Sequence, residues 1–147
     1  MKKLISWIVI VGIIGFVLLQ LVPFGRDHTN PQVVQEPVWS SPETRQMAKE
    51  HCFQCHSNET TWPWYSNIAP ASWLIYNDVV EGRRKFNFSD WGNRPGELNE
   101  IVSAIEEGEM PPIQYWLFHP SSRLSAAQKD AFISGLKATG GMAGNSD

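Results

Sequence analysis

A five-residue motif constrains the fold of this chain most, because it places both of the chain's cysteines beside one of its four histidines. The motif is Cys52-Phe53-Gln54-Cys55-His56, and its C-x-x-C-H spacing is typical of haem c attachment. In a helix, positions i, i+3 and i+4 share one face, so the two thiols and the imidazole would point at one side of a planar group. The sequence therefore predicts one covalent haem c on Cys52 and Cys55, with its iron bound by His56.

Three other uses of the motif remain open. A thioredoxin-like redox pair is expected beside a βαβ pattern, which the sequence lacks. A zinc ion could take Cys52, Cys55 and His56 together with His51, but tetrahedral sites normally draw their ligand pairs from separate segments. A disulfide between residues so close in the chain would close too small a loop to stabilise a fold. The haem interpretation is favoured over all three.

The iron of an electron carrier usually has a second axial ligand. Outside the apolar N-terminal segment the candidates are Met47, Met110, Met142, His28, His51 and His119. Met110 is favoured because it follows a helix end and precedes two prolines, and a residue before proline is held out of helical geometry. His119 is the runner-up. A methionine ligand would raise the reduction potential relative to a second histidine.

The second strong feature is an apolar stretch from Leu4 to Val22, preceded by Lys2 and Lys3. As a helix it would be roughly 28 Å long, close to the hydrocarbon thickness of a bilayer. We interpret it as a retained single-pass anchor. The alternative is a cleaved signal peptide, which has a shorter apolar core that ends in small residues. The lysines before the helix predict that the rest of the chain faces outward, which in a bacterium is the periplasmic side of the inner membrane.

The sequence predicts an anchor over 1–24, a tether over 25–41, a haem-binding domain over 42–140 and a flexible tail over 141–147. The tether is inferred from its prolines and polar residues and from its lack of apolar periodicity. Trp39 is the exception in this stretch, since a large aromatic side chain in a linker usually packs on a nearby domain.

The domain is expected to be all-α, a small cytochrome c-like fold of about four helices around the haem, because no segment shows the alternation of a strand. The helices are expected over 42–55, 71–84 and 96–107, and from Ser125 to about 140. In the second of these, Trp73, Leu74, Asn77 and Val80 are expected to face inward.

Two of the expected helices carry clear end signals. Gly108 is placed to end the third helix in a left-handed conformation, after an amphipathic stripe of leucine, isoleucine and valine. The fourth helix opens with a capping box formed by Ser125 and Gln128. It is expected to bury Phe132, Ile133 and Leu136, which recur at helical spacing.

Aromatic residues gather just after the motif, where Trp62, Trp64 and Tyr65 are expected to wall the haem. The stretch from Cys52 to Trp91, CFQCHSNETTWPWYSNIAPASWLIYNDVVEGRRKFNFSDW, resembles the bacterial haem-binding domain family, whose members share C-x-x-C-H followed by a W-P-W-Y-S-type segment. With lower specificity the resemblance covers about 39–136. It implies a compact haem c domain, often tethered to a membrane, and it names no redox partner.

The charge pattern narrows the range of functions. The 12 Lys and Arg against 15 Asp and Glu give a formal net charge of -3. No run of like charge is long enough to indicate a nucleic-acid-binding surface, so we expect no nucleic-acid partner. We expect a one-electron carrier rather than an enzyme, with a redox protein as its partner. The N-terminal helix is expected to anchor it in the membrane. The alternatives are a peroxidase-like haem enzyme, which needs an open iron position, and a haem-based sensor.

Overall fold

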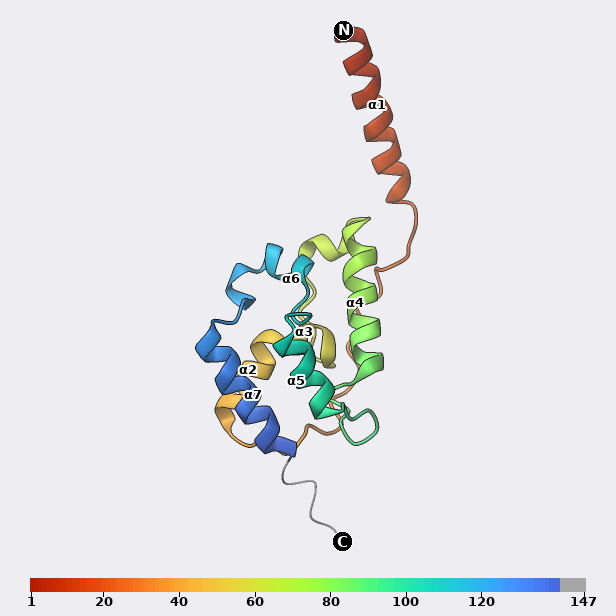
Figure 1. Cartoon of the computed structure of the whole chain (residues 1–147). Coiled ribbons are helices and arrows are strands. Elements are labelled where there is room, and N and C mark those ends of the chain that lie inside the picture. The colour runs from red at the N-terminus through yellow and green to blue at the C-terminus, as the bar shows by residue number, and fades with distance from the viewer. Residues whose placement is uncertain (141–147) are drawn as a thin grey trace. The chain divides into compact units, whose positions relative to one another are not determined.

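The computed structural model describes residues 1–140, apart from the side chains of Gln114, Trp116, Phe118, Ser121 and Gly140. Its regular elements are helices (Figure 1): α1 Lys2–Leu19, α2 Pro42–His51, α3 Phe53–His56, α4 Ala71–Lys85, α5 Leu98–Glu106, α6 Ile113–Phe118 and α7 Ala126–Gly140, with short 3-10 turns at Trp64–Asn67 and Pro120–Ser122. Across residues 1–140, β structure is limited to an isolated bridge between Gln35 and Asp90. The predicted all-α fold is confirmed.

The chain forms two compact units. The first consists of Met1–Thr29 and Thr61–Val80, and the second of Asn30–Thr60 and Glu81–Asp147. The C-x-x-C-H motif belongs to the second unit. The predicted flexible tail, 141–147, lies outside the described residues.

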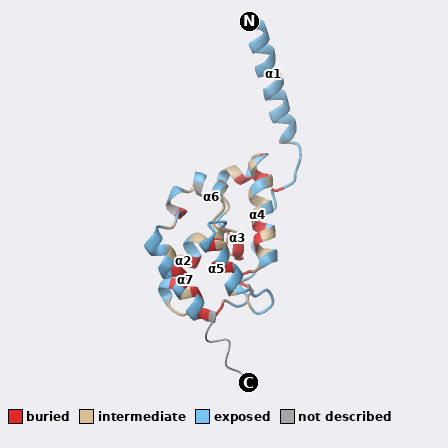
Figure 2. Ribbon diagram, viewed as in Figure 1, coloured by how far each residue is buried: buried red, intermediate tan, exposed pale blue. Residues whose placement is uncertain are grey.

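Helices α2, α5 and α7 supply most of the hydrophobic core of the second unit. The buried members of this core are Ala48, Phe53, Phe88, Ile101, Val102, Ile105, Phe132, Ile133 and Leu136, and Figure 2 shows buried positions on all three helices. Helices α2 and α7 approach closely because residue 135 is glycine, and a side-chain carbon there would collide with Thr44. The predicted burial of the three apolar residues of α7 is confirmed.

Three helix ends follow from local capping. The N–H of Thr44 donates to Oγ of Ser41 at the start of α2 (3.1 Å). Ser125 and Gln128 cap α7 reciprocally, since the N–H of Ser125 donates to Oε1 of Gln128 (3.0 Å) and the N–H of Gln128 donates to Oγ of Ser125 (3.3 Å). Gly108, after α5, has φ of 77°, a conformation that glycine adopts without strain. These predictions are confirmed.

One helix boundary and one additional helix differ from the prediction. The helix expected over 42–55 is broken, because α2 ends at His51 and Cys52 has φ of -123° and ψ of -36° before α3 begins. Helix α6 was not predicted. It has only 6 residues, begins after two prolines and lacks a side-chain cap, so it gives none of the usual sequence signals.

The inward face predicted for α4 is wrong. Leu74 and Val80, which were expected inside, are 46% and 41% exposed. The buried residues of α4 are Ser72, Val79 and Gly82, which lie on one side of a helix with 3.6 residues per turn. Two of these positions lie against backbone, Gly82 against the carbonyl of Cys55 and Ser72 against Gly25. Side-chain hydrophobicity therefore does not identify this face.

The segment predicted to be a tether, 25–41, makes specific contacts within each unit. In the first unit Gly25 is buried with φ of 78°, and a Cβ there would lie 2.5 Å from the carbonyl oxygen of Ser72. In the second unit the N–H groups of Val34 and Gln35 both donate to the carbonyl of Ser89 (2.8 and 3.1 Å). The segment is therefore packed rather than free.

Trp39 packs on the second unit, as predicted, with its ring centroid 5.1 Å from that of Phe88. Its Nε1 donates to the Glu36 carboxylate (2.7 Å), which also accepts two hydrogen bonds from Arg45 (2.7 and 2.6 Å). Burial alone would raise the pKa of Glu36, but the hydrogen bonds from Arg45 and Trp39 outweigh it and hold this pKa below its ordinary value.

We expect Glu36→Gln to lower the free energy of unfolding by roughly 1 kcal/mol at neutral pH, because it removes the charge from this hydrogen-bonded pair. The ionised Glu36 contributes fully above its unfolded-state pKa of 4.5, and this contribution is lost as the pH falls through the lower folded-state value. Denaturant unfolding should therefore show a smaller difference from wild type at about pH 3 than at about pH 7. Glu109→Gln, at an exposed position, is the control, and an equal difference at both pH values would contradict the prediction.

Candidate functional site

The C-x-x-C-H motif lies at the junction of α2 and α3. The break at Cys52 keeps helical hydrogen bonding, because the N–H of Cys52 donates to the carbonyl of Ala48 (2.9 Å) and the N–H of His56 donates to that of Cys52 (2.9 Å). Cys52 and His56 are therefore about one turn apart, with Cys55 on the same turn. The predicted i, i+3, i+4 arrangement is present, at a helix bend rather than inside one continuous helix.

The two cysteines are half-buried and are not joined in a disulfide. Cys52 packs against the hydrophobic core, and burial, together with the neighbouring Cys55, raises the pKa of its thiol to about 12. Redox exchange uses a thiolate, and burial of the Cys52 thiol opposes that form. Within residues 1–140, moreover, no group of three or more His, Cys, Asp or Glu side chains is placed to hold a metal ion. These observations disfavour the disulfide, thioredoxin and zinc interpretations.

His56 is buried, with 7% of its surface exposed, and its ring stacks on that of Phe86 with centroids 4.0 Å apart and planes 10° apart. Its Nδ1 is buried without a hydrogen-bond partner. Burial lowers the pKa of the imidazole to about 4, against the opposing effect of backbone groups of Phe86 and Gly82. The ring is therefore neutral at physiological pH, which is the form that binds metals. A buried ring nitrogen without a partner needs a ligand or a proton acceptor, so His56 fits the role of an iron ligand.

The end of α4 lies directly on the motif. Gly82 is buried, and a Cβ at this position would lie 2.6 Å from the carbonyl oxygen of Cys55 and 3.0 Å from its carbonyl carbon. Backbone atoms cannot move aside without shifting the whole turn, so this approach requires the absence of a side chain. Gly82 therefore fixes how closely α4 supports the turn that carries the thiols.

Hydrogen bonds from later in the chain fix the turn after the motif. Nε of Arg83 donates to the carbonyl of Ser57 (2.8 Å), and the N–H of Phe88 donates to the carbonyl of His56 (2.8 Å). Oγ of Ser57 donates back to the carbonyl of Phe53 (2.7 Å). The backbone on either side of His56 is thus held by three hydrogen bonds.

The two leading candidates for the second axial ligand lie after α5 and after α6. Met110 is half-buried, and its N–H donates to the carbonyl of Ala104 (3.1 Å). His119 stacks on Tyr115 with ring centroids 4.5 Å apart, and its Nδ1 lies 3.1 Å from the Tyr115 carbonyl oxygen. These contacts fix the backbone of Met110 and the ring of His119. Ligation by Met110 stays a prediction.

The other candidates have structural contacts or are not described. Nδ1 of His51 lies 3.0 Å from the carbonyl oxygen of Ser122. His28 stacks on Trp62 in the first unit, with centroids 4.4 Å apart and planes 14° apart. Met47 packs against the core of the second unit. The remaining candidate, at position 142, lies outside the described residues.

The three aromatic residues predicted to wall the haem all belong to the first unit. Trp62 has His28 as its stacking partner. Trp64 is 76% exposed and meets Tyr65 edge-on, with centroids 5.7 Å apart. These contacts lie within the first unit, and a role of the three residues against the haem stays a prediction.

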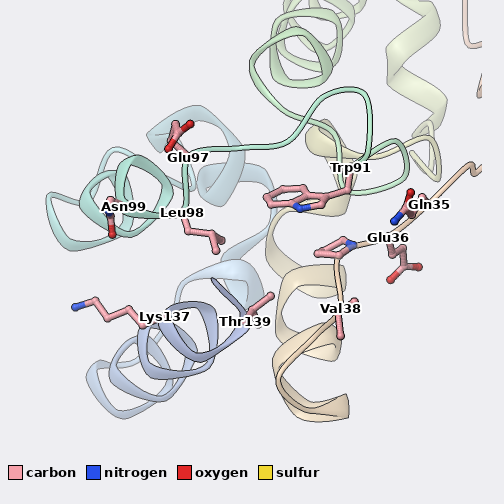
Figure 3. A pocket seen from close by; sticks show the side chains of 10 residues that line it. Gln35, Glu36, Val38, Trp91, Glu97, Leu98, Asn99, Lys137 and Thr139 are labelled. Atoms are coloured by element: carbon pink, nitrogen blue, oxygen red, sulfur yellow. The ribbon is translucent and has the colours of Figure 1, made fainter. Parts of the chain in front are cut away.

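A pocket of about 700 Å³ opens in the second unit beside Trp91 (Figure 3). It is lined by Gln35, Glu36, Pro37, Val38, Trp91, Glu97, Leu98, Asn99, Lys137 and Thr139. Trp91 stacks on Phe88 (5.5 Å, 9°), Phe88 meets Phe86 edge-on (5.2 Å, 74°), and Phe86 stacks on His56. A continuous series of aromatic rings therefore runs from the imidazole to the wall of this pocket.

Three residues that position the motif were not predicted from the sequence: Gly82, Arg83 and Phe86. They lie too far along the chain for any local spacing to connect them with it. One signal was available, because a glycine inside a helix costs about 1 kcal/mol relative to alanine. Such a residue often marks a close approach between backbones.

The model of a family described as a haem-binding domain matches residues 14–138 of the chain. The matched range includes the C-x-x-C-H motif and residues 82–88, which contact it. No curated protein and no solved structure shows a significant match.

Proposed function

Because the chain belongs to the haem-binding domain family, we propose that it is a membrane-anchored monohaem c-type cytochrome that transfers one electron at a time. One observation carries the proposal. Both cysteines lie on one helical turn with His56, whose buried, neutral imidazole has no hydrogen-bond partner at Nδ1. This donor set suits covalent attachment of one haem with iron ligation.

In this proposal Cys52 and Cys55 hold the haem as thioethers, and His56 binds its iron. When bound, the haem supplies reversible one-electron exchange. The ring of Phe86 fixes the plane of the imidazole, and the depressed pKa of His56 means that no proton has to leave before ligation. The core around Cys52 keeps water away from this side of the site.

Intact mass and an optical spectrum test the proposal on full-length protein matured in cells that attach haem c. We expect the denatured chain to carry the mass of one haem and the native protein to show a haem spectrum that responds to reductant and oxidant. A colourless chain at its polypeptide mass would contradict the proposal.

The second axial ligand proposed is Met110. Exchanging Met110→Leu keeps the size of the side chain and removes the thioether, so we expect the reduction potential to fall by on the order of 100 mV. The ferrous protein should also gain carbon monoxide binding. Met47→Leu is the matched control, because Met47 packs in the core. An unchanged potential in Met110→Leu would exclude this ligand, and a change in His119→Ala instead would identify His119.

We also propose that α1 anchors the protein in the inner membrane with the haem domain on the periplasmic side. Of the helices described, α1 is the one long and apolar enough to cross a bilayer, and all of its residues are exposed. Lys2 and Lys3 precede its apolar residues, which favours an inside amino terminus. Contacts of residues 20–25 with the rest of the first unit support retention of the helix, since cleavage beyond residue 25 would remove them.

Carrier and enzyme can be separated by ligand binding. A peroxidase-like enzyme needs an open iron position and a distal acid or base. We propose a carrier without enzymatic activity, so wild-type ferrous protein should bind carbon monoxide only weakly. Tight binding together with peroxide turnover would favour the enzyme.

A further inference from the structure

The end of α1 is bound to a segment far along the chain. Gln20 follows α1, and its side-chain amide pairs with the backbone of Ala69. Nε2 donates to the Ala69 carbonyl (3.0 Å), and Oε1 accepts from the Ala69 N–H (2.9 Å). A two-bond contact of this kind fixes orientation as well as distance. Residues around Ala69 are thus held at the point where α1 ends.

The next residues keep to the same segment. Phe24 meets Tyr76 edge-on, with ring centroids 5.4 Å apart and planes 77° apart. The backbone of Gly25 touches that of Ser72, so closely that a Cβ would lie 2.5 Å from the Ser72 carbonyl oxygen. After α1 the chain therefore folds back on 61–80 at successive points and does not lead away from it.

The length of α1 determines the depth in a bilayer at which Gln20 contacts Ala69. Its 18 residues make a helix roughly 27 Å long, against a hydrocarbon core of roughly 30 Å. Gln20 then lies at the edge of the hydrocarbon, where an unpaired amide is costly. Its pairing with Ala69 removes that cost and holds 61–80 at the level of the lipid headgroups.

The surface of 61–80 has a composition that suits the lipid headgroup region. Asp78 is the one charged residue in the segment. Trp64 is 76% exposed and Leu74 is 46% exposed, and Leu21 and Phe24 in the same unit are exposed as well. Tryptophan and tyrosine side chains favour the membrane–water interface, where one end of the ring is apolar and the other is wet. Trp64 is five positions from Ala69, a reach of at most about 17 Å.

We propose that 61–80 forms a membrane-interface seat, in which Trp64 and the exposed Leu74 insert among the lipid headgroups on the side of the bilayer where α1 ends. This inference rests on the proposed anchor. The first unit is then held against the membrane by a second contact in addition to α1.

Photo-crosslinking tests the seat on the full-length, haem-loaded protein in nanodiscs of phosphatidylcholine and phosphatidylglycerol. The photoreactive residue p-benzoylphenylalanine replaces Ile8, Trp64 or Glu43 in separate variants, and lipid adducts are counted by mass spectrometry. Ile8 lies in α1 and reports on the anchor itself. Glu43, exposed on α2, gives the background. We expect adducts at position 64 to approach the level at position 8 and to exceed that at position 43 at least fivefold.

The outcomes are distinguishable. Lipid adducts at 8 with only background at 64, or protein adducts in place of lipid at 64, would overturn the seat and leave the anchor standing. A lack of adducts at 8 would overturn both. Adding Gln20→Leu, which removes the pair with Ala69, should reduce the adducts at 64 severalfold and leave those at 8 unchanged. Equal adducts at 64 with and without Gln20→Leu would show that this pair does not hold the seat, and would overturn that step.

Discussion

Replacing Cys52 and Cys55 together with alanine is expected to abolish covalent haem attachment completely. The chain has no other cysteine, and thioether formation requires a thiol. The measurement is the mass of the denatured full-length chain, which should fall to that of the polypeptide. Each single replacement should retain the haem on the remaining thiol, with an altered optical spectrum, because one thioether is left.

The control for the double replacement is Glu50→Gln, at an exposed position on α2, which should keep the full haem mass. If the double replacement still carried haem after denaturation, attachment would use another side chain. The proposal of a c-type cytochrome would then be wrong.

The second large effect is expected from Gly82→Ala. The new Cβ would lie 2.6 Å from the carbonyl oxygen of Cys55, so either α4 or the motif turn has to move. Overpacking of this kind costs about 1–3 kcal/mol, and the higher helix propensity of alanine returns at most about 1 kcal/mol. We expect a melting temperature about 5 °C lower and a clearly smaller haem-loaded fraction, with a larger loss for Gly82→Val.

Asn77→Ala gives the matched control, since it places alanine at an exposed position of the same helix. It should leave stability unchanged or raise it slightly, because alanine is the better helix former. Thermal unfolding and intact mass measure both variants. Equal stability and equal loading of Gly82→Ala and Asn77→Ala would show that the close approach to Cys55 is unimportant.

The features predicted correctly from the sequence depend on residues close together in the chain. The capping box of Ser125 and Gln128 and the left-handed Gly108 are set within a few positions, so local chemistry is sufficient to find them. The same is true of the apolar stripes of α5 and α7, whose helical spacing identifies the buried side. The C-x-x-C-H motif was found for the same reason.

The features that were missed depend on contacts between distant segments. The inward face of α4 is set by the approach of Gly82 to Cys55, which no hydrophobic pattern records. The break between α2 and α3 at Cys52 likewise reflects packing against the core. The stack of Phe86 on His56 joins residues that only the folded chain brings together. Composition and spacing therefore locate the motif, and tertiary contacts decide how it is supported.

The core that encloses Cys52 includes Phe132, Ile133 and Leu136, all contributed by α7. In the proposed topology the residues after α1 cross the membrane in chain order, so Cys52 and Cys55 would emerge before α7. Until α7 packs, the core beside Cys52 would be incomplete. Under the proposed function, haem would then be attached to an accessible thiol before the core closes on it.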